Sequence, residues 1–192
     1  MSLLVGLSGY ARSGKDSAAT VLTDGSWVRA SFADKLREFL LALDPLVPTD
    51  PNVTGSHERL SSLVAAYGWE TCKDNLGEVR SLLQRCGTEA GRKVLGEDVW
   101  VNAVLSSMTS LTPIVVTDVR FPNEANAIVK RGGMVLRINR PGIGPKANAD
   151  GEVHASETAL DDWRFDYVLQ NDGTLEELHA EVLFAVGQGM VA

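Results

Sequence analysis

Residues 3–17 read LLVGLSGYARSGKDS, and this pattern predicts a strand, a loop and a helix in succession. Leu3–Leu7 is a short apolar run, typical of a buried parallel strand. Gly9–Lys15 matches the pattern G-x-x-x-x-G-K, and a helix is expected over Gly14–Leu22. A glycine-rich loop between a strand and a helix points its backbone N–H groups at an anion, and the helix adds its positive end. We therefore predict that the loop binds the phosphates of a nucleoside triphosphate, with Lys15 reaching the β- and γ-phosphates.

The position after Lys15 departs from the usual pattern. A Ser or Thr hydroxyl normally binds magnesium there, but this chain has Asp16, followed by Ser17. The carboxylate either takes part in binding Mg²⁺ or holds Lys15 or Arg12 by a charge-assisted hydrogen bond. The alternative is that Asp16 only complements the positive end of the helix. We expect a role tied to the metal or to the cations of the loop.

Predicted strands and helices alternate along most of the chain. Further strands are expected at residues 27–32, 113–117, 134–138 and 166–169, and further helices at 34–43, 57–67, 78–95, 98–108, 123–131 and 174–186. This alternation predicts an α/β fold, with a parallel sheet covered by helices on both faces. Residues 45–56 contain three of the seven prolines and are expected to be loop or broken helix. Residues 45–108 thus form a helical insertion without a strand of its own.

Composition limits the class of protein. The 192 residues fit one domain, and a formal charge of −7 without a dense basic run argues against nucleic-acid binding. Two cysteines and three histidines form neither a disulfide framework nor a zinc pattern, so Cys72 and Cys86 are expected to be free thiols in a reducing compartment. No apolar run reaches membrane-spanning length and no signal peptide is evident, so we expect a cytoplasmic protein without a membrane partner.

A second charged group follows the strand at residues 113–117. Asp118 stands at its carboxyl end, where ligands collect in α/β sheets, and is placed like a second magnesium-organising acid. Arg120 follows two residues later. Its guanidinium either binds a phosphate bidentately or pairs with Glu124 across a helix start.

Phosphoryl transfer depends mainly on positioning and on neutralising negative charge, so several cations must converge on one point. The candidates are Arg12, Lys35, Arg37, Arg80, Arg85, Arg137, Arg140 and Lys146. Arg12 lies inside the phosphate loop. Arg140 opens a long stretch, residues 140–153, that is rich in Gly, Pro, Asn and Asp and is expected to be exposed. An arginine on such a loop is typical of a lid that excludes water.

Two further groups are candidates for binding nucleobases. Trp69, Gln84 and Thr88, in the helical insertion, are expected to line a pocket for the acceptor base, whereas Trp100 is expected in the core. Asn171 precedes the last helix and either reads the base of the donor or lies in a turn whose role is to let Thr174 cap that helix.

The blocks LSGYARSGKDSAA, QRCGTEAG, VVTDVRFPNEANAI and INRPG occur in this order. With them, the sequence resembles the deoxynucleoside monophosphate kinases of tailed bacteriophages, within the nucleoside monophosphate kinase superfamily. The Gly-Lys-Asp variant of the loop is also similar to animal phosphomevalonate kinases. The resemblance implies a three-layer α/β/α P-loop fold with a five-stranded parallel sheet in one domain, residues 1–192. Its core would span about 1–44 and 110–192, its helical acceptor-binding region about 45–109 and its lid about 140–157.

The resemblance also implies MgATP as donor and deoxynucleoside monophosphates as acceptors, in the host cytoplasm if the chain is phage-encoded; homodimerisation stays open. The donor site would comprise Gly9, Arg12, Ser13, Gly14, Lys15, Asp16, Ser17, Asn171 and Gly173. The acceptor site would comprise Lys35, Trp69, Arg80, Gln84, Thr88, Asp118 and Arg120, and the lid Arg140, His154 and Glu157. Catalysis is assigned to Arg12, Lys15, Asp16, Arg120 and Arg140, and the metal to Asp16, Ser17 and Asp118.

Two alternatives remain at this point. The first keeps the loop and the chemistry but changes the acceptor to another small phosphorylated metabolite, such as phosphomevalonate or dephospho-coenzyme A. The second is a nucleotide-binding switch or ATPase that uses the same loop without an acceptor.

Overall fold

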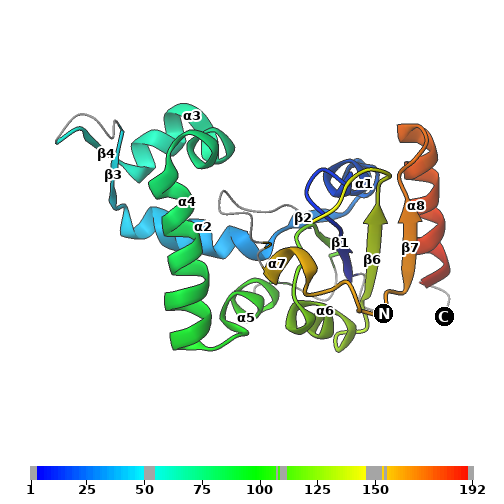
Figure 1. Cartoon of the computed structure of the whole chain (residues 1–192). Helices are drawn as coiled ribbons and strands as arrows, with labels where there is room; N and C mark the ends of the chain where they lie inside the picture. Colours follow the sequence, from blue (N-terminus) through cyan, green and yellow to red (C-terminus); the bar gives the residue numbers. More distant parts are fainter. Residues whose placement is uncertain are drawn as a thin grey trace. The chain divides into compact units, whose positions relative to one another are not determined.

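A five-stranded sheet, in which every pairing is parallel, follows from the apolar runs of the sequence (Figure 1). The computed structural model describes residues 4–49, 55–106, 108, 112–145, 153 and 155–189. The strands are β1 (Leu4–Ser8), β2 (Val28–Ala30), β5 (Ile114–Val116), β6 (Met134–Asn139) and β7 (Tyr167–Gln170). Their order is β2-β5-β1-β6-β7, which places the strand before the phosphate loop at the centre.

Helices cover both faces of this sheet. Val5 and Leu7 of β1 lie in one hydrophobic cluster with residues of α1 (Lys15–Thr23) and α8 (Leu175–Gly189). Gly6 faces the opposite side, where a Cβ would come within 2.6 Å of Ile128 on α6 (Pro122–Val129). Alternate residues of a strand point to opposite faces, so β1 connects two helical layers. The predicted three-layer α/β/α fold is confirmed.

The chain divides into two compact units. The first comprises residues 1–32 and 105–192, and holds the sheet together with the short helix α7 (Ala155–Thr158). The second, residues 33–104, is mainly helical. The structure therefore places α2 (Phe32–Leu43) almost wholly in the helical unit, whereas the sequence-based division assigned residues up to 44 to the core.

The helical unit has its own core. Besides α2 it contains α3 (Leu60–Asn75), α4 (Gly77–Gln84), the π-helix η1 (Arg85–Leu95) and α5 (Val99–Leu105). Trp100 is buried, as expected, and its indole N–H donates to the carbonyl oxygen of Gly87 at 2.9 Å. Helix α3 is interrupted at Gly68, whose φ of 77° lies in the left-handed region. Cys72 is buried, Cys86 is half-buried, and both are free thiols.

The expectation that this region has no strand was wrong. Leu46–Pro48 (β3) pairs antiparallel with His57–Arg59 (β4), so residues 57–59 are not helical. The extended form is stabilised because Val47 is fully buried in the helical unit and because the Arg59 side chain donates to the carbonyl oxygen of Asp44. Most of the remaining expected strands and helices are present with ends shifted by a few residues. The helix expected at residues 57–67 extends further, as α3, and residues 78–95 form α4 and η1. No helix among the described residues has the length and apolar character needed to cross a membrane.

Candidate active site

The phosphate loop holds a backbone shape that two of its glycines permit. Gly9 and Gly14 have φ values of 144° and 105°, which side-chain-bearing residues rarely adopt. A Cβ on Gly9 would come within 2.4 Å of the carbonyl oxygen of Ile138, and one on Gly14 within 2.3 Å of the Asn171 amide nitrogen. Arg12 is also left-handed, at φ 65°, and is exposed. The loop is therefore packed closely against the ends of β6 and β7.

Lys15 points back into this loop. Its Nζ donates to the carbonyl oxygens of Gly9 and Tyr10, both at 2.7 Å. Burial, followed by the nearby guanidinium of Arg120, lowers the pKa of Lys15 from 10.5 to about 8. Two cations thus share one small region of the first unit, and an anion bound between them would relieve their repulsion.

The carboxylate of Asp16 meets a cation that sequence reasoning did not single out. Its Oδ1 accepts from Arg29 Nη2 of β2 at 2.5 Å, with both side chains largely exposed. Among the described residues its ion pair is with Arg29, whereas Lys15 and Arg12 were the cations considered from the sequence as one alternative to binding Mg²⁺. Helix α1, which carries Asp16, contacts β2, which carries Arg29. Ser17, the next residue, is exposed.

Asp118 lies at the carboxyl edge of the sheet, as predicted. Its Oδ2 accepts from the Ser31 hydroxyl at 2.6 Å, and its Oδ1 accepts from the backbone N–H of Phe32 at 2.8 Å. Asp118 therefore connects the ends of β5 and β2, which are neighbouring strands in the sheet.

Arg120 pairs with the predicted lid residue Glu157 of α7. The distance from Arg120 Nη1 to Glu157 Oε1 is 3.0 Å, and the Glu157 side chain is only 13% exposed. Glu124 was one of two possible partners considered for the Arg120 side chain. It is buried and accepts from the backbone N–H groups of Arg120 and Phe121 at the start of α6. The negative charge of Glu157 also raises the pKa of Lys15, against the larger lowering effects, so Glu157 lies near both cations.

The other candidate cations of the first unit differ in their exposure and in their partners. The Arg137 side chain is 9% exposed and pairs with Asp161 at 3.1 Å, and its charge adds, after burial and Arg120, to the lowering of the pKa of Lys15. Arg140, just after β6, is exposed as a lid residue would be. His154 and Lys146 lie outside the described residues.

The turn before α8 caps that helix and also contacts the phosphate loop. Thr174 and Glu177 form reciprocal bonds: the backbone N–H of Thr174 donates to Glu177 Oε2 at 2.7 Å, and the N–H of Glu177 donates to the Thr174 hydroxyl at 3.2 Å. This is the capping role expected of Thr174. Asn171 instead reaches the phosphate loop, where its amide donates to the carbonyl oxygen of Ser13 at 2.8 Å. Gly173 packs against Glu177, which a Cβ would approach within 2.2 Å.

The predicted acceptor residues of the helical unit are mostly exposed or half-exposed. Lys35 pairs with Glu38 at 2.7 Å, and Arg80 is 3.5 Å from Asp74. Trp69 lies under the guanidinium of Arg37, 5.7 Å from its ring centroid. Gln84 is exposed and Thr88 is half-buried.

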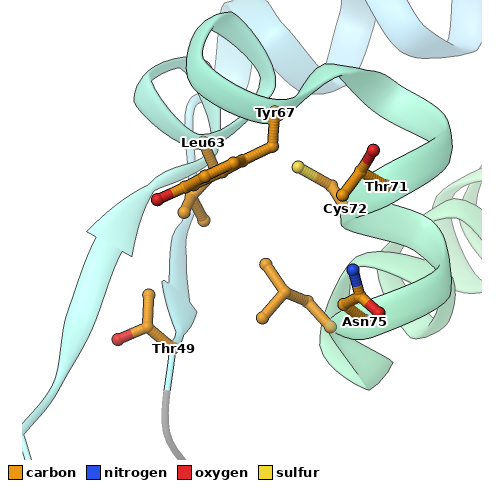
Figure 2. A pocket seen from close by; sticks show the side chains of 7 residues that line it. Thr49, Leu63, Tyr67, Thr71, Cys72 and Asn75 are labelled. Carbon is orange, nitrogen blue, oxygen red and sulfur yellow. The ribbon is translucent and has the colours of Figure 1, made fainter.

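The helical unit also contains a pocket of about 250 Å³ beside the interrupted helix α3 (Figure 2). It is lined by Thr49, Leu63, Tyr67, Thr71, Cys72, Asn75 and Leu76. None of the predicted acceptor residues lines it. Its lining includes no lysine or arginine, so it lacks the positive charge that a phosphate group requires.

The central strand is followed by a glycine loop with an inward-pointing lysine and then by a helix. In a parallel sheet of this strand order, this arrangement defines a P-loop nucleotide-binding protein. The model of the family described as deoxynucleotide monophosphate kinase matches residues 65–182. The chain belongs to this family. It is an ATP-dependent phosphotransferase of the nucleotide kinase class, which confirms the resemblance drawn from the sequence.

Two relatives and one solved structure illustrate these similarities. The chain is 30% identical to a putative deoxynucleotide monophosphate kinase of Acanthamoeba polyphaga mimivirus, over 96% of each chain. It is 29% identical to the deoxynucleoside-5'-monophosphate kinase of Escherichia phage T5, over 67% of this chain and 72% of that one. Dephospho-CoA kinase from Campylobacter jejuni aligns over 97% of each chain with 15% identity and a TM-score of 0.45, a likeness too weak to support an argument.

Proposed function

We propose that this chain transfers the γ-phosphoryl group of MgATP to a deoxynucleoside monophosphate, giving a deoxynucleoside diphosphate and ADP. The observation that carries the proposal is the proximity of Lys15 and Arg120: burial, and after it the charge of Arg120, lowers the pKa of the lysine. Two polyanions must approach each other in this reaction, and cations fixed at one point reduce their repulsion. The membership of the chain in the deoxynucleotide monophosphate kinase family supports the same acceptor class.

The phosphate loop would bind the donor. Its backbone N–H groups and Lys15 hold the β- and γ-phosphates, while Asn171 keeps the loop in place through the carbonyl oxygen of Ser13. Arg120 would bind the phosphate of the acceptor after separating from Glu157. The acceptor oxygen already carries negative charge near neutral pH, so the chain needs no strong general base.

The side-chain oxygens proposed for Mg²⁺ fit a metal site in which the phosphates of the nucleotide supply further ligands. Among the described residues there is no group of three or more acidic, histidine or cysteine side chains that would hold a metal ion by itself. Mg²⁺ is usually bound by one or two carboxylates, water and substrate phosphates. Asp16, Ser17 and Asp118 supply such oxygens. When bound, Mg²⁺ neutralises charge on the phosphate oxygens.

The helical unit would bind the rest of the acceptor. Lys35 and Arg80 supply positive charge, while Trp69, Gln84 and Thr88 supply stacking and hydrogen-bonding groups for the nucleoside. The free thiols Cys72 and Cys86 support the cytoplasm as the place of the reaction.

A coupled assay for ADP tests this proposal. The chain is mixed with MgATP and each of the four deoxynucleoside monophosphates, each ribonucleoside monophosphate, phosphomevalonate, dephospho-coenzyme A or no acceptor. We expect ADP with at least one deoxynucleoside monophosphate and loss of that activity in Lys15→Met. Equal ADP formation without an acceptor would indicate an ATPase, and activity only with a metabolite would contradict the acceptor class.

A further inference from the structure

Arg137 is a buried cation that the proposed reaction does not use. Its guanidinium stacks on two rings, 4.5 Å from the centroid of Tyr10 and 5.6 Å from that of Phe165. Its Nη2 donates to Asp161 Oδ1 at 3.1 Å, and its Nε to Asn139 Oδ1 at 3.3 Å. A guanidinium is costly to bury without such partners, so the arrangement is a built feature of the first unit.

Asp161 connects this buried cation to the phosphate loop. The same Oδ1 that accepts from Arg137 also accepts from the hydroxyl of Tyr10, at 2.9 Å. Tyr10 is the second residue of the loop, and its carbonyl oxygen accepts from Lys15 Nζ at 2.7 Å. A continuous series of contacts therefore runs from Arg137 through Asp161 and Tyr10 to the lysine.

We infer that Tyr10, Asp161 and Arg137 are positioning residues for the phosphate loop, and that they orient Lys15 through the carbonyl oxygen of Tyr10. The inference rests on the proposed function of this loop. Asn171 holds the loop near its end, through Ser13, whereas the Tyr10 hydroxyl bonds its beginning to Asp161, far away in the sequence. Catalytic groups displaced by about 1 Å lose much of their effect, so both ends of the loop must be fixed.

Asp161 also lies close in the sequence to Glu157, which must separate from Arg120 in our proposal, whereas Asp161 itself keeps its partners. Glu157 lies four residues earlier, on α7, and its partner Arg120 is needed for the acceptor phosphate. Among the described residues, Asp161 Oδ1 accepts from the Tyr10 hydroxyl and the Arg137 guanidinium, and no substrate requires either group in our proposal. Glu157 can therefore leave Arg120 while Asp161 continues to hold the loop.

Tyr10→Phe is the decisive variant, because it removes the hydroxyl and keeps the ring over Arg137. We expect kcat/KM for ATP to fall about tenfold, mainly through KM, with the KM of the acceptor unchanged. The carbonyl acceptor of Lys15 becomes less well fixed, so the charged amine is less stabilised and the basic limb of the pH profile moves to lower pH. Asp161→Asn should act in the same direction. Tyr167→Phe, which removes a hydroxyl from β7 in the same unit, is the matched control.

Stability is measured alongside, because the buried Arg137 makes its own variants prone to unfolding. A purely structural cluster would lower the melting temperature of Tyr10→Phe and Asp161→Asn while leaving the KM for ATP and the pH limb at their wild-type values, and this result would overturn the inference. Calorimetric titration with MgATP needs no acceptor. A wild-type chain that binds MgATP but phosphorylates no deoxynucleoside monophosphate would refute the proposed function only, and the Tyr10→Phe comparison would still decide this inference.

Discussion

Binding of ATP should take up a proton at alkaline pH, because Lys15 is partly uncharged in the empty loop. Its pKa is lowered from 10.5 to about 8, first by burial and then by Arg120. Phosphate oxygens favour the charged amine, so we take the pKa in the complex to be about 10.5 or higher. Affinity for ATP is therefore highest below the pKa of the free loop and decreases as the pH rises above about 8.

The number of protons taken up and the change in affinity follow from these two pKa values. At pH 9 Lys15 is about 9% protonated in the free protein and about 97% in the complex, so binding takes up about 0.9 proton. Between pH 7.5 and pH 9 the affinity for MgATP should therefore fall about eightfold. The upper part of this range avoids most of the titration of the γ-phosphate itself.

Isothermal titration calorimetry with Mg²⁺ and a non-hydrolysable ATP analogue measures both quantities. Titrations at pH 9 in two buffers with different ionisation enthalpies give the number of protons taken up, and titrations from pH 7.5 to pH 9 give the affinity. Lys15→Arg is the matched control, because its guanidinium stays charged and its profile should be flat. A flat profile and no proton uptake in the wild-type protein would refute the reasoning about Lys15.

Three further predictions concern single positions. Gly14→Ala should weaken ATP binding more than tenfold in a calorimetric titration, because φ is 105° and the new Cβ would displace Asn171; near-normal affinity would show that the loop adapts. Glu124→Ala removes a buried carboxylate that accepts two backbone N–H groups, and should lower the free energy of unfolding by about 2 kcal/mol in urea titration. A loss below about 0.5 kcal/mol would argue against that capping role. Trp100→Phe leaves the carbonyl oxygen of Gly87 without its donor and should cost about 2 kcal/mol by the same measurement, with ATP affinity unchanged; a change in affinity instead would contradict a purely structural role.

The phosphate loop was predictable because its determinants are local. A strand, two glycines at fixed spacing and a lysine at a helix start are all contained in one short stretch, and the structure has them in that form. The parallel sheet was predictable for a related reason, since β1 and β5 are short buried apolar runs and predicted strands alternate with helices along the chain. The predicted roles of individual residues in binding and catalysis stay predictions.

The β3–β4 hairpin was missed because its signals are weak. Each strand has three residues, Pro48 suggested a loop, and His57–Arg59 carries no strand-like alternation of apolar residues. The pairing depends on burial of Val47 in the helical unit, which is a property of the tertiary structure.

The partners of the charged groups could not be predicted from the neighbouring sequence either. Asp161 is 151 residues from Tyr10, and Glu157 is 37 residues from Arg120, with no periodicity to relate them. One signal was available: Arg137 stands between Leu136 and Ile138 in an otherwise apolar strand, and a charge in such a strand requires a buried partner. The identity of that partner needed the fold.

The two carbonyl contacts of Lys15 have an energetic consequence for nucleotide capture. A free lysine side chain carries roughly 2 kcal/mol of rotamer entropy, which a ligand must normally remove when it immobilises the amine. Here folding has already immobilised the amine against Gly9 and Tyr10. An incoming triphosphate therefore meets an ordered ammonium group, and more of its interaction energy remains as net affinity.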